Sequence, residues 1–347
     1  MKKIIGVLMV LSLVLLVGCG GSSDANKKTT KTTTASSNFA KVEVKSGEYA
    51  IIPDVSEDDL STLALTIKVT NTGKEKLYVE SNGFELYEKD SNEKVKAEDF
   101  YNNDIDTFES DTLSKDKNIT GTIFFNIDPK KEYKLVFEAM DDSGESEDIE
   151  LDIDVSKYED SKKALDESLK AASAFIDVQF LAKDNEDYAK LVGNDEEKTK
   201  TELLDKFQKE NEDALFYDID LSDEDYQKCF DSFTSVQGKR AKMDKELVGQ
   251  YGDKAVVSIE INEGLSNEAI YDLFSDYEEK YMESTDDYEG YKEYAFSKYT
   301  EILEKSELKS DSHERLLYLE KKDGKWNIDI EITENEDLIM ALQGSIY

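Results

Sequence analysis

The chain has 347 residues, of which 80 are acidic and 43 are basic, so its formal net charge is −37. So acidic a surface argues against binding to nucleic acid, whose phosphates require basic side chains, and against lying flat on anionic lipid. The apolar fraction of 38%, with 19 Tyr and 15 Phe, is enough for folded cores, and the length suits two domains of about 100–200 residues.

The N-terminal segment predicts export as a lipoprotein. Two lysines precede an apolar run from Ile4 to Val17, which is shorter than the about 20 residues of a transmembrane helix. The quartet Leu16-Val17-Gly18-Cys19 resembles the bacterial lipobox. The resemblance implies a signal peptide over residues 1–18 and a diacylglyceryl group on Cys19, which would anchor the protein to the membrane at its extracellular face.

Residues 19–38 predict a flexible tether after the lipidated cysteine. Gly, Ser, Thr and Lys dominate this segment and show no apolar periodicity. Lys27, Lys28 and Lys31 make it the only basic segment of the mature chain. Two interpretations of these lysines stay open. They could attract anionic lipid or wall polymer weakly, or they could belong to a plain solubilising spacer.

Residues 39–156 show the period of two that is typical of β-strands. Leu63, Leu65 and Ile67 alternate with polar residues, and a turn follows at Asn71-Thr72-Gly73. Similar runs predict seven more strands, at Lys41–Lys45, Tyr49–Ile52, Lys76–Val79, Phe84–Glu88, Ile119–Ile127, Tyr133–Ala139 and Ile149–Val155. This series of short strands predicts an all-β sandwich.

Four of these runs carry a resemblance to a known family. The runs are Leu65–Gly73, Phe84–Tyr87, Gly121–Phe125 and Tyr133–Phe137. They resemble the immunoglobulin-like domain of unknown function found near the N-terminus of Gram-positive surface lipoproteins. The resemblance implies an immunoglobulin-like sandwich that serves as a binding or spacer module outside the cell.

Residues 157–347 change to a helical period and predict a helix-rich α+β domain. Leu165, Leu169, Ala172, Ile176 and Phe180 share one face of a first helix. The later predicted elements are a helix at Asn185–Val192, one opening at Asp195, one capped by Ser222 and Asp225, a strand at Ala255–Ile261, helices at Ser266–Thr285 and Asp287–Lys305, a hairpin of Leu316–Lys321 and Lys325–Ile330 around Asp323-Gly324, and a helix at Glu336–Leu342. The few strands predict a small antiparallel sheet.

This order of elements, ending in a hairpin with Gly324-Lys325-Trp326, resembles the cone-shaped α+β folds of the nuclear-transport-factor-2 type. The pairing of the two domains is more similar to the uncharacterised C-terminal domains that follow the immunoglobulin-like module in Gram-positive lipoproteins.

Enzyme signatures are mostly missing from the chain. His313 is the only histidine, which excludes a multi-histidine zinc site and would make it the base of any Ser–His–Asp triad. The 80 acids are too many to single out a glycosidase pair. We therefore predict no catalytic residue, no cofactor and no metal ligand, and leave open whether the protein is an enzyme.

Two acidic clusters resemble calcium-binding loops in the spacing of their oxygen-bearing side chains. Asp218, Asp220, Ser222 and Glu224 alternate as calcium ligands do, but Asp223 stands where the loop needs glycine. The run Asp141–Glu145 could ligate an extracellular ion or form a hairpin turn. Solvated acidic faces are the favoured interpretation of both, and calcium binding stays open.

Cys229 lies in a helical pattern and has no partner for a disulfide if Cys19 is lipidated. We interpret Cys229 as a small buried hydrophobe. A reactive thiol would need a basic neighbour to lower its pKa, and the sequence offers only Lys228 beside it.

Tyrosines are concentrated between residues 271 and 299. Tyr277 and Tyr281 fall on an apolar helical face and are core positions by default. Tyr271, Tyr288 and Tyr294 lie off the apolar faces, so they are the candidates for a groove that binds sugar or peptide.

The function predicted from these features is that of a lipid-anchored extracellular protein that binds a ligand, such as cell wall or peptide, at the envelope. One alternative is a cell-envelope hydrolase that uses carboxylates of the C-terminal domain. Another is a substrate receptor for a transporter, which is disfavoured because the chain lacks two βαβ-built lobes.

Overall fold

The computed structural model describes residues 33–53, 55–56, 60–98, 107–108, 110–216, 219–285 and 290–346. By their contacts the residues fall into two compact units. The first unit comprises residues up to 48 together with 55–159, and the second comprises 49–54 together with 160–347. The short segment Tyr49–Asp54 therefore belongs to the second unit, although strands of the first unit flank it in the sequence.

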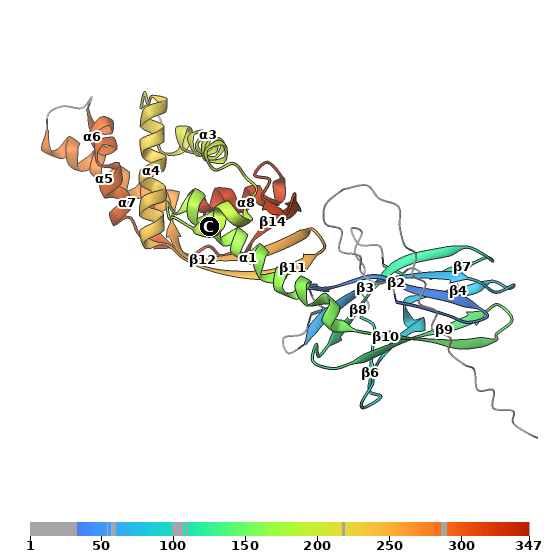
Figure 1. The fold of residues 1–347 in the computed structure, drawn as a ribbon. Helices are drawn as coiled ribbons and strands as arrows, with labels where there is room; N and C mark the ends of the chain where they lie inside the picture. Colours follow the sequence, from blue (N-terminus) through green and yellow to red (C-terminus); the bar gives the residue numbers. More distant parts are fainter. Residues whose placement is uncertain are drawn as a thin grey trace, which may run out of the picture. The chain divides into compact units, whose positions relative to one another are not determined.

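The first unit is built from strands (blue to green in Figure 1). They are β1 (Thr33–Ser36), β2 (Ala40–Ala50), β3 (Ser61–Asn71), β4 (Leu77–Val79), β5 (Phe84–Glu88), β6 (Lys94–Val95), β7 (Asp111–Leu113), β8 (Asn118–Ile127), β9 (Tyr133–Asp141) and β10 (Ser146–Ile153), with single-turn helices η1 (Ser81–Gly83) and η2 (Val155–Tyr158). One sheet has the order β1-β2-β3-β8, and the other has the order β6-β5-β9-β4-β7 with β10 also paired to β9.

Strands β3 and β8 show why the first unit has a core. Their antiparallel pairing runs from Ser61 opposite Ile127 to Thr70 opposite Asn118. The alternating apolar residues of β3 are fully buried, as the period of two predicts. Strand β8 is buried on both faces from Gly121 onward. At Gly121 itself, Phe108 packs so closely that a Cβ would lie 2.8 Å from its ring.

The last part of the predicted tether is a strand. Residues 33–36 form β1, which pairs with residues 41–44 of β2. The β-branched Thr33 and Thr34 suit an extended conformation, and Thr33 lies opposite Val44. The sequence interpretation missed this strand because β1 has no apolar alternation of its own and takes its order from β2.

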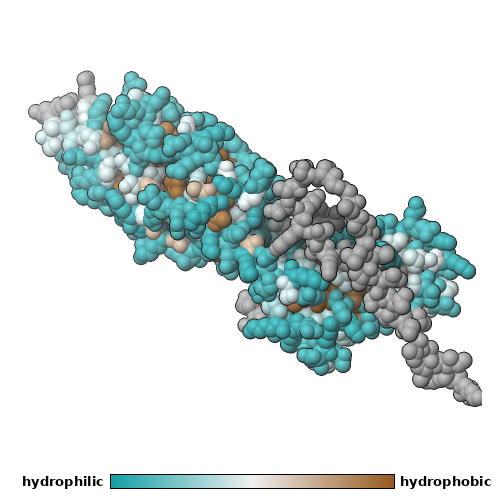
Figure 2. Space-filling model, viewed as in Figure 1, coloured by the Kyte–Doolittle hydropathy of each residue, from teal (hydrophilic) through white to brown (hydrophobic). Residues whose placement is uncertain are grey.

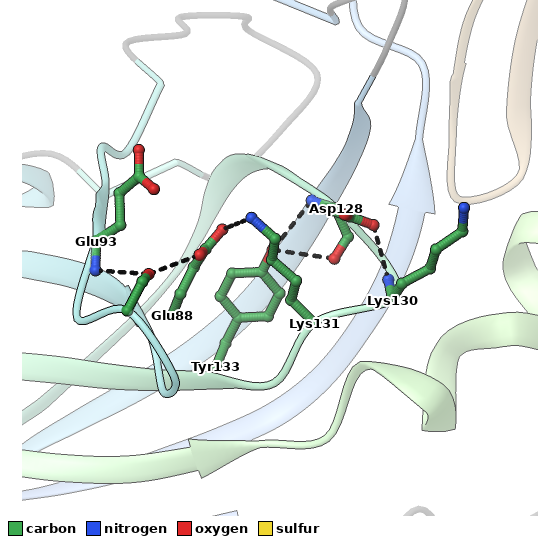
Figure 3. A network of polar contacts seen from close by, with 7 residues as sticks. Glu88, Glu93, Asp128, Lys130, Lys131 and Tyr133 are labelled. Atoms are coloured by element: carbon green, nitrogen blue, oxygen red, sulfur yellow. Dashed lines mark hydrogen bonds and ion pairs between the residues drawn. The ribbon is translucent and has the colours of Figure 1, made fainter.

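A polar network fastens the connection between β8 and β9 (Figure 3). The Tyr133 hydroxyl donates to the carbonyl oxygen of Asp128 and accepts from its N–H group, both at 3.0 Å. The Lys131 ammonium donates to the Glu88 carboxylate at the end of β5, which also accepts from the Ser91 hydroxyl. Burial raises the pKa of the Tyr133 phenol, so the hydroxyl keeps its proton at neutral pH.

The second unit contains the long helices and an antiparallel sheet (green to red in Figure 1). The elements from residue 159 onward are α1 (Glu159–Phe180), α2 (Glu186–Leu191), α3 (Glu196–Ala214), α4 (Asp223–Arg240), β11 (Lys242–Tyr251), β12 (Lys254–Leu265), α5 (Asn267–Ser284), α6 (Tyr291–Ser297), α7 (Tyr299–Lys305), β13 (Leu308–Lys309), β14 (Arg315–Lys322), β15 (Lys325–Asn327) and α8 (Thr333–Leu342). The sheet has the order β11-β12-β14-β15, and β13 also pairs with β12.

Aromatic side chains fill the interior of the second unit. The largest of its fully buried side chains are Trp326, Phe175, Phe180, Phe207, Phe216 and Phe230. Outside these cores, hydrophilic side chains cover most of the face drawn in Figure 2. The described residues of the second unit therefore form a core packed with aromatic rings, as the apolar spacing of the helices predicts.

Local signals located several elements of the second unit correctly. Ser222 and Asp225 form the predicted capping box of α4. The hairpin turn has positive φ at both Asp323 and Gly324, which is the type I′ geometry that Asp-Gly favours. Strand β11 was missed, because its first residues, Lys-Met-Asp-Lys-Glu, are charged and give little β signal. The helix predicted at 287–305 is split into α6 and α7 at Lys298.

Gly238→Ala should destabilise the second unit, although Gly to Ala in a helix normally stabilises by about 1 kcal/mol. A Cβ at Gly238 would lie 1.9 Å from the carbonyl oxygen of Leu181, and a backbone atom cannot move aside cheaply. We expect the free energy of unfolding to fall by about 1–3 kcal/mol. Urea unfolding followed by the fluorescence of Trp326, the only tryptophan, measures this. Ser235→Ala on the same helix is the control. A more stable Gly238→Ala variant would contradict the close approach of the Leu181 carbonyl oxygen to Gly238.

Candidate functional site

The tyrosines of α5 and α6 form the most distinctive surface of the second unit. Both helices lie at the end of this unit away from its sheet (Figure 1). We call Tyr277 and Tyr281 of α5 with Tyr291 and Tyr294 of α6 the tyrosine tip. All four side chains are half-buried, so part of each remains accessible to solvent.

Tyr281 and Tyr294 hold α5 and α6 together. Their rings are stacked with centroids 4.8 Å apart and an interplanar angle of 27°. The ammonium of Lys298 lies 5.8 Å from the centroid of the Tyr294 ring, and that of Lys292 lies 6.0 Å from the Tyr291 ring. Lysine ammonium groups over ring faces are attracted by the π electrons, so rings and cations order one another at the tip.

Tyr277 joins α5 to α7 through a charged pair. Its hydroxyl donates to Glu301 Oε1 at 3.1 Å, and Lys305 Nζ donates to the same oxygen at 2.7 Å and to the Tyr277 hydroxyl at 3.1 Å. The hydrogen bonds from Lys305 and then Tyr277 hold the pKa of Glu301 below its usual value. The Glu301 carboxylate raises the pKa of Lys305 in turn.

The structure describes two of the three tyrosines predicted to form a groove, and it places them apart. Tyr294 belongs to the tyrosine tip. Tyr271 is 54% exposed on α5, but it precedes Tyr281 by ten residues, which is about 15 Å along the helix axis. Tyr288 lies outside the described residues. The groove therefore stays a prediction, and the ring that Tyr294 meets, Tyr281, is one that sequence reasoning had assigned to the core.

Ser312, His313 and Asp311 lie close together but are not arranged as a catalytic triad. Its Nδ1 atom lies 3.0 Å from the Ser312 hydroxyl and 3.6 Å from Asp311 Oδ1. A triad needs the serine and the carboxylate on opposite ring nitrogens, whereas here both approach the same one. The Asp311 carboxylate is also bound by Arg315, whose Nε lies 2.7 Å from Oδ2, so Asp311 serves as a structural anchor.

The acidic clusters cap and turn the backbone. Asp141 Oδ1 accepts hydrogen bonds from the N–H groups of Ser143 and Glu145 and from the Ser143 hydroxyl, which makes residues 141–145 the turn between β9 and β10. Ser222 caps α4, and Asp218 lies outside the described residues. Across the described ranges no group of three or more His, Cys, Asp or Glu side chains is arranged to hold a metal ion.

The two cysteines differ in what the structure says of them. Cys229 is 2% exposed, and burial raises the pKa of its thiol to about 12, so the reactive thiolate is absent at neutral pH. Cys19 lies outside the described residues. Among the helices that are described, none is long and apolar enough to cross a membrane.

Two surface hollows were not foreseen from the sequence. One, of about 690 Å³, is lined in the first unit by Glu85, Lys134 and Asp148 among others. Burial and then the neighbouring carboxylates raise the pKa of Asp148.

The other hollow, of about 610 Å³, lies beside β11 in the second unit. There burial lowers the pKa of Lys245, whose ammonium lies 3.6 Å from Asp177. The sequence could not predict that Lys245 is mostly buried, because β11 itself was not predicted and its register was unknown.

Glu301→Gln should remove part of the acid sensitivity of the second unit. Because the pKa of Glu301 is lowered on folding, its contribution to stability is complete above about pH 4.3, the usual glutamate value, and is lost as the pH falls through the folded-state pKa. We expect the Tm of wild type to fall more steeply than that of Glu301→Gln between about pH 5 and 3. Glu304→Gln, an exposed acid of the same helix, is the control, and parallel curves for all three chains would contradict the network.

Comparison with known proteins gives a family match over each unit. The model for a domain of unknown function, DUF5105, matches residues 158–343, and that for another, DUF4352, matches residues 25–149. The curated relative YcdA of Bacillus subtilis, described as an uncharacterized lipoprotein, is 26% identical over 98% of both chains. The crystal structure of ycdA from Bacillus subtilis has a TM-score of 0.66 and 23% identity, and covers 90% of this chain and 99% of its own. The shared fold confirms the predicted order, a β-rich region followed by a helix-rich region with a sheet.

Proposed function

The chain belongs to the family of DUF5105, a domain of unknown function, and from that premise we propose that it is a lipid-anchored protein that binds a ligand at the cell envelope without catalysing a reaction. A relative that matches 98% of the chain is described as an uncharacterized lipoprotein, and the quartet ending at Cys19 supplies the matching signal. The anchor would be on Cys19, and the folded units would stand at the extracellular face of the membrane.

The first unit would serve as an immunoglobulin-like spacer or binding module over residues 39–156. Its two antiparallel sheets separate β1-β2-β3-β8 from the strands around β9, which suits a sandwich. The Tyr133 hydroxyl at the start of β9 bonds back to the backbone of Asp128 (Figure 3), as the tyrosine corner of such sandwiches does. Residues 19–32 would remain as the tether, and residues 157–347 would form the second domain.

The observation that carries the binding proposal is the tyrosine tip. Half-exposed tyrosine rings give an apolar face and a polar edge, which suits the stacking of sugar rings and the packing of peptide side chains. The stack of Tyr281 on Tyr294 fixes the rings before any ligand arrives, so little side-chain freedom is lost on binding. Cell-wall glycan or peptide is the ligand class that fits both the rings and the location.

Cys19→Ala should abolish the anchor. Without the thiol there is no site for the diacylglyceryl group, and cleavage before residue 19 should stop. Fractionation of cells that express the variant measures this as loss of the mature chain from the membrane fraction. Normal processing of the variant and full membrane retention would contradict the proposed anchor.

Tyr294→Ala should weaken binding to solubilised cell-wall fragments about tenfold, which corresponds to about 1.4 kcal/mol. It should also cost about 0.5–1.5 kcal/mol of stability because the stack with Tyr281 is lost. Tyr294→Phe keeps the ring and should retain most of the affinity. Tyr78→Ala, at a tyrosine of the first unit that is 48% exposed, is the control, and equal affinities for all the chains would rule out the tip.

A further inference from the structure

β11 is the outer strand of its sheet, and its outer edge pairs with an extended segment of the chain. Ile51 forms an antiparallel bridge with Gln250: its N–H group donates to the Gln250 carbonyl oxygen at 2.9 Å, and its carbonyl oxygen accepts from the Gln250 N–H group at 2.7 Å. The contact follows the register shift of β11 between Leu247 and Gly249. A β-bulge of this kind re-aims a strand edge.

Side chains of the second unit complete a slot around residues 49–53. The N–H group of Tyr49 donates to the Ser161 hydroxyl of α1 at 2.8 Å, and the Lys162 ammonium lies 5.5 Å from the Tyr49 ring centroid. Pro53 packs at Gly249, where a Cβ would lie 3.7 Å from the proline ring. The segment is well covered, with Tyr49 2%, Ala50 3% and Ile52 3% exposed.

The slot itself is held in place by a buried polar side chain. Gln250 is 8% exposed, and its Oε1 accepts from the Ser168 hydroxyl at 2.5 Å while its Nε2 donates to the Ala164 carbonyl oxygen at 3.5 Å. Both partners lie on α1 and not on the segment. The bound geometry of the Gln250 backbone therefore does not depend on the segment that pairs with it.

We propose that this slot is a strand-acceptor site for extended, uncharged peptides of the type tyrosine-alanine-isoleucine-isoleucine-proline, with Tyr49–Pro53 as its resident, exchangeable occupant. Main-chain pairing supplies affinity in strand addition, and pockets for alternate side chains supply specificity. The five residues carry no charged side chain, so the same segment of another polypeptide would regain every contact. Only the high effective concentration of the resident segment opposes it.

The test uses the full mature chain without its lipid and a labelled synthetic peptide with the sequence of residues 48–55. In the chain, Ile51→Pro removes the N–H donor to Gln250, and Ile52→Asp places a charge at a covered position, so the resident segment should leave. Fluorescence anisotropy should show the peptide binding this variant at least tenfold more tightly than it binds wild type. A peptide carrying both substitutions should bind neither chain, and Ser161→Ala should weaken binding severalfold.

The emission of Trp326 shows whether the second unit of each variant is folded. If the double variant is unfolded, Ile52→Ala replaces it with the same expected direction. Equal affinity of the peptide for wild type and a folded variant would overturn the proposal. A second result would also overturn the proposal: light scattering shows a wild-type dimer, Ile51→Pro dissociates it, and the peptide fails to bind. The slot would then exchange strands only between copies of the chain.

Discussion

Contacts between buried aromatic rings hold the helices of the second unit together. The Phe207 ring lies 5.4 Å from Phe230 and 5.6 Å from Phe233, which links α3 to α4. Phe216 lies 5.8 Å from Tyr226 and 5.5 Å from Tyr299, which links α4 to α7. Rings occupy the centre of this unit, and the two binding sites that we propose, at the tyrosine tip and at the edge of β11, lie outside this centre.

Charge is used in two ways by this acidic chain. Most acids lie on the solvated surface and keep the protein soluble through mutual repulsion. Some of the lysines pair with acids of separate segments, as Lys131 does with Glu88 and Lys245 does with Asp177. An exposed pair adds little stability by itself, but such pairs fix which segments meet, and at the tyrosine tip the ammonium groups also fix the rings.

Local chemistry could be predicted from the sequence, and long-range pairing could not. Asp323-Gly324 defines its own turn, and Ser222 with Asp225 defines its own helix start, because the atoms involved lie within a few residues. The run Tyr49–Ile52 was predicted to be a separate strand of the sandwich, whereas Tyr49 and Ala50 end β2 and Ile51 forms an isolated bridge. Nothing local shows that Ile51 pairs with Gln250. The tip was only partly foreseen, because helical spacing places Tyr281 on a core face and cannot show that α5 continues beyond that core.

The close approach of Leu181, the residue after α1, to α4 at Gly238 has a consequence for comparing homologous chains. The Leu181 carbonyl oxygen occupies the space that a side chain at position 238 would need. A homologue with any larger residue there must move the backbone at Leu181, directly after the end of α1, away from α4. Glycine at this position is therefore a marker, readable in an alignment, of which relatives keep the close approach of Leu181 to α4 and which have rearranged it.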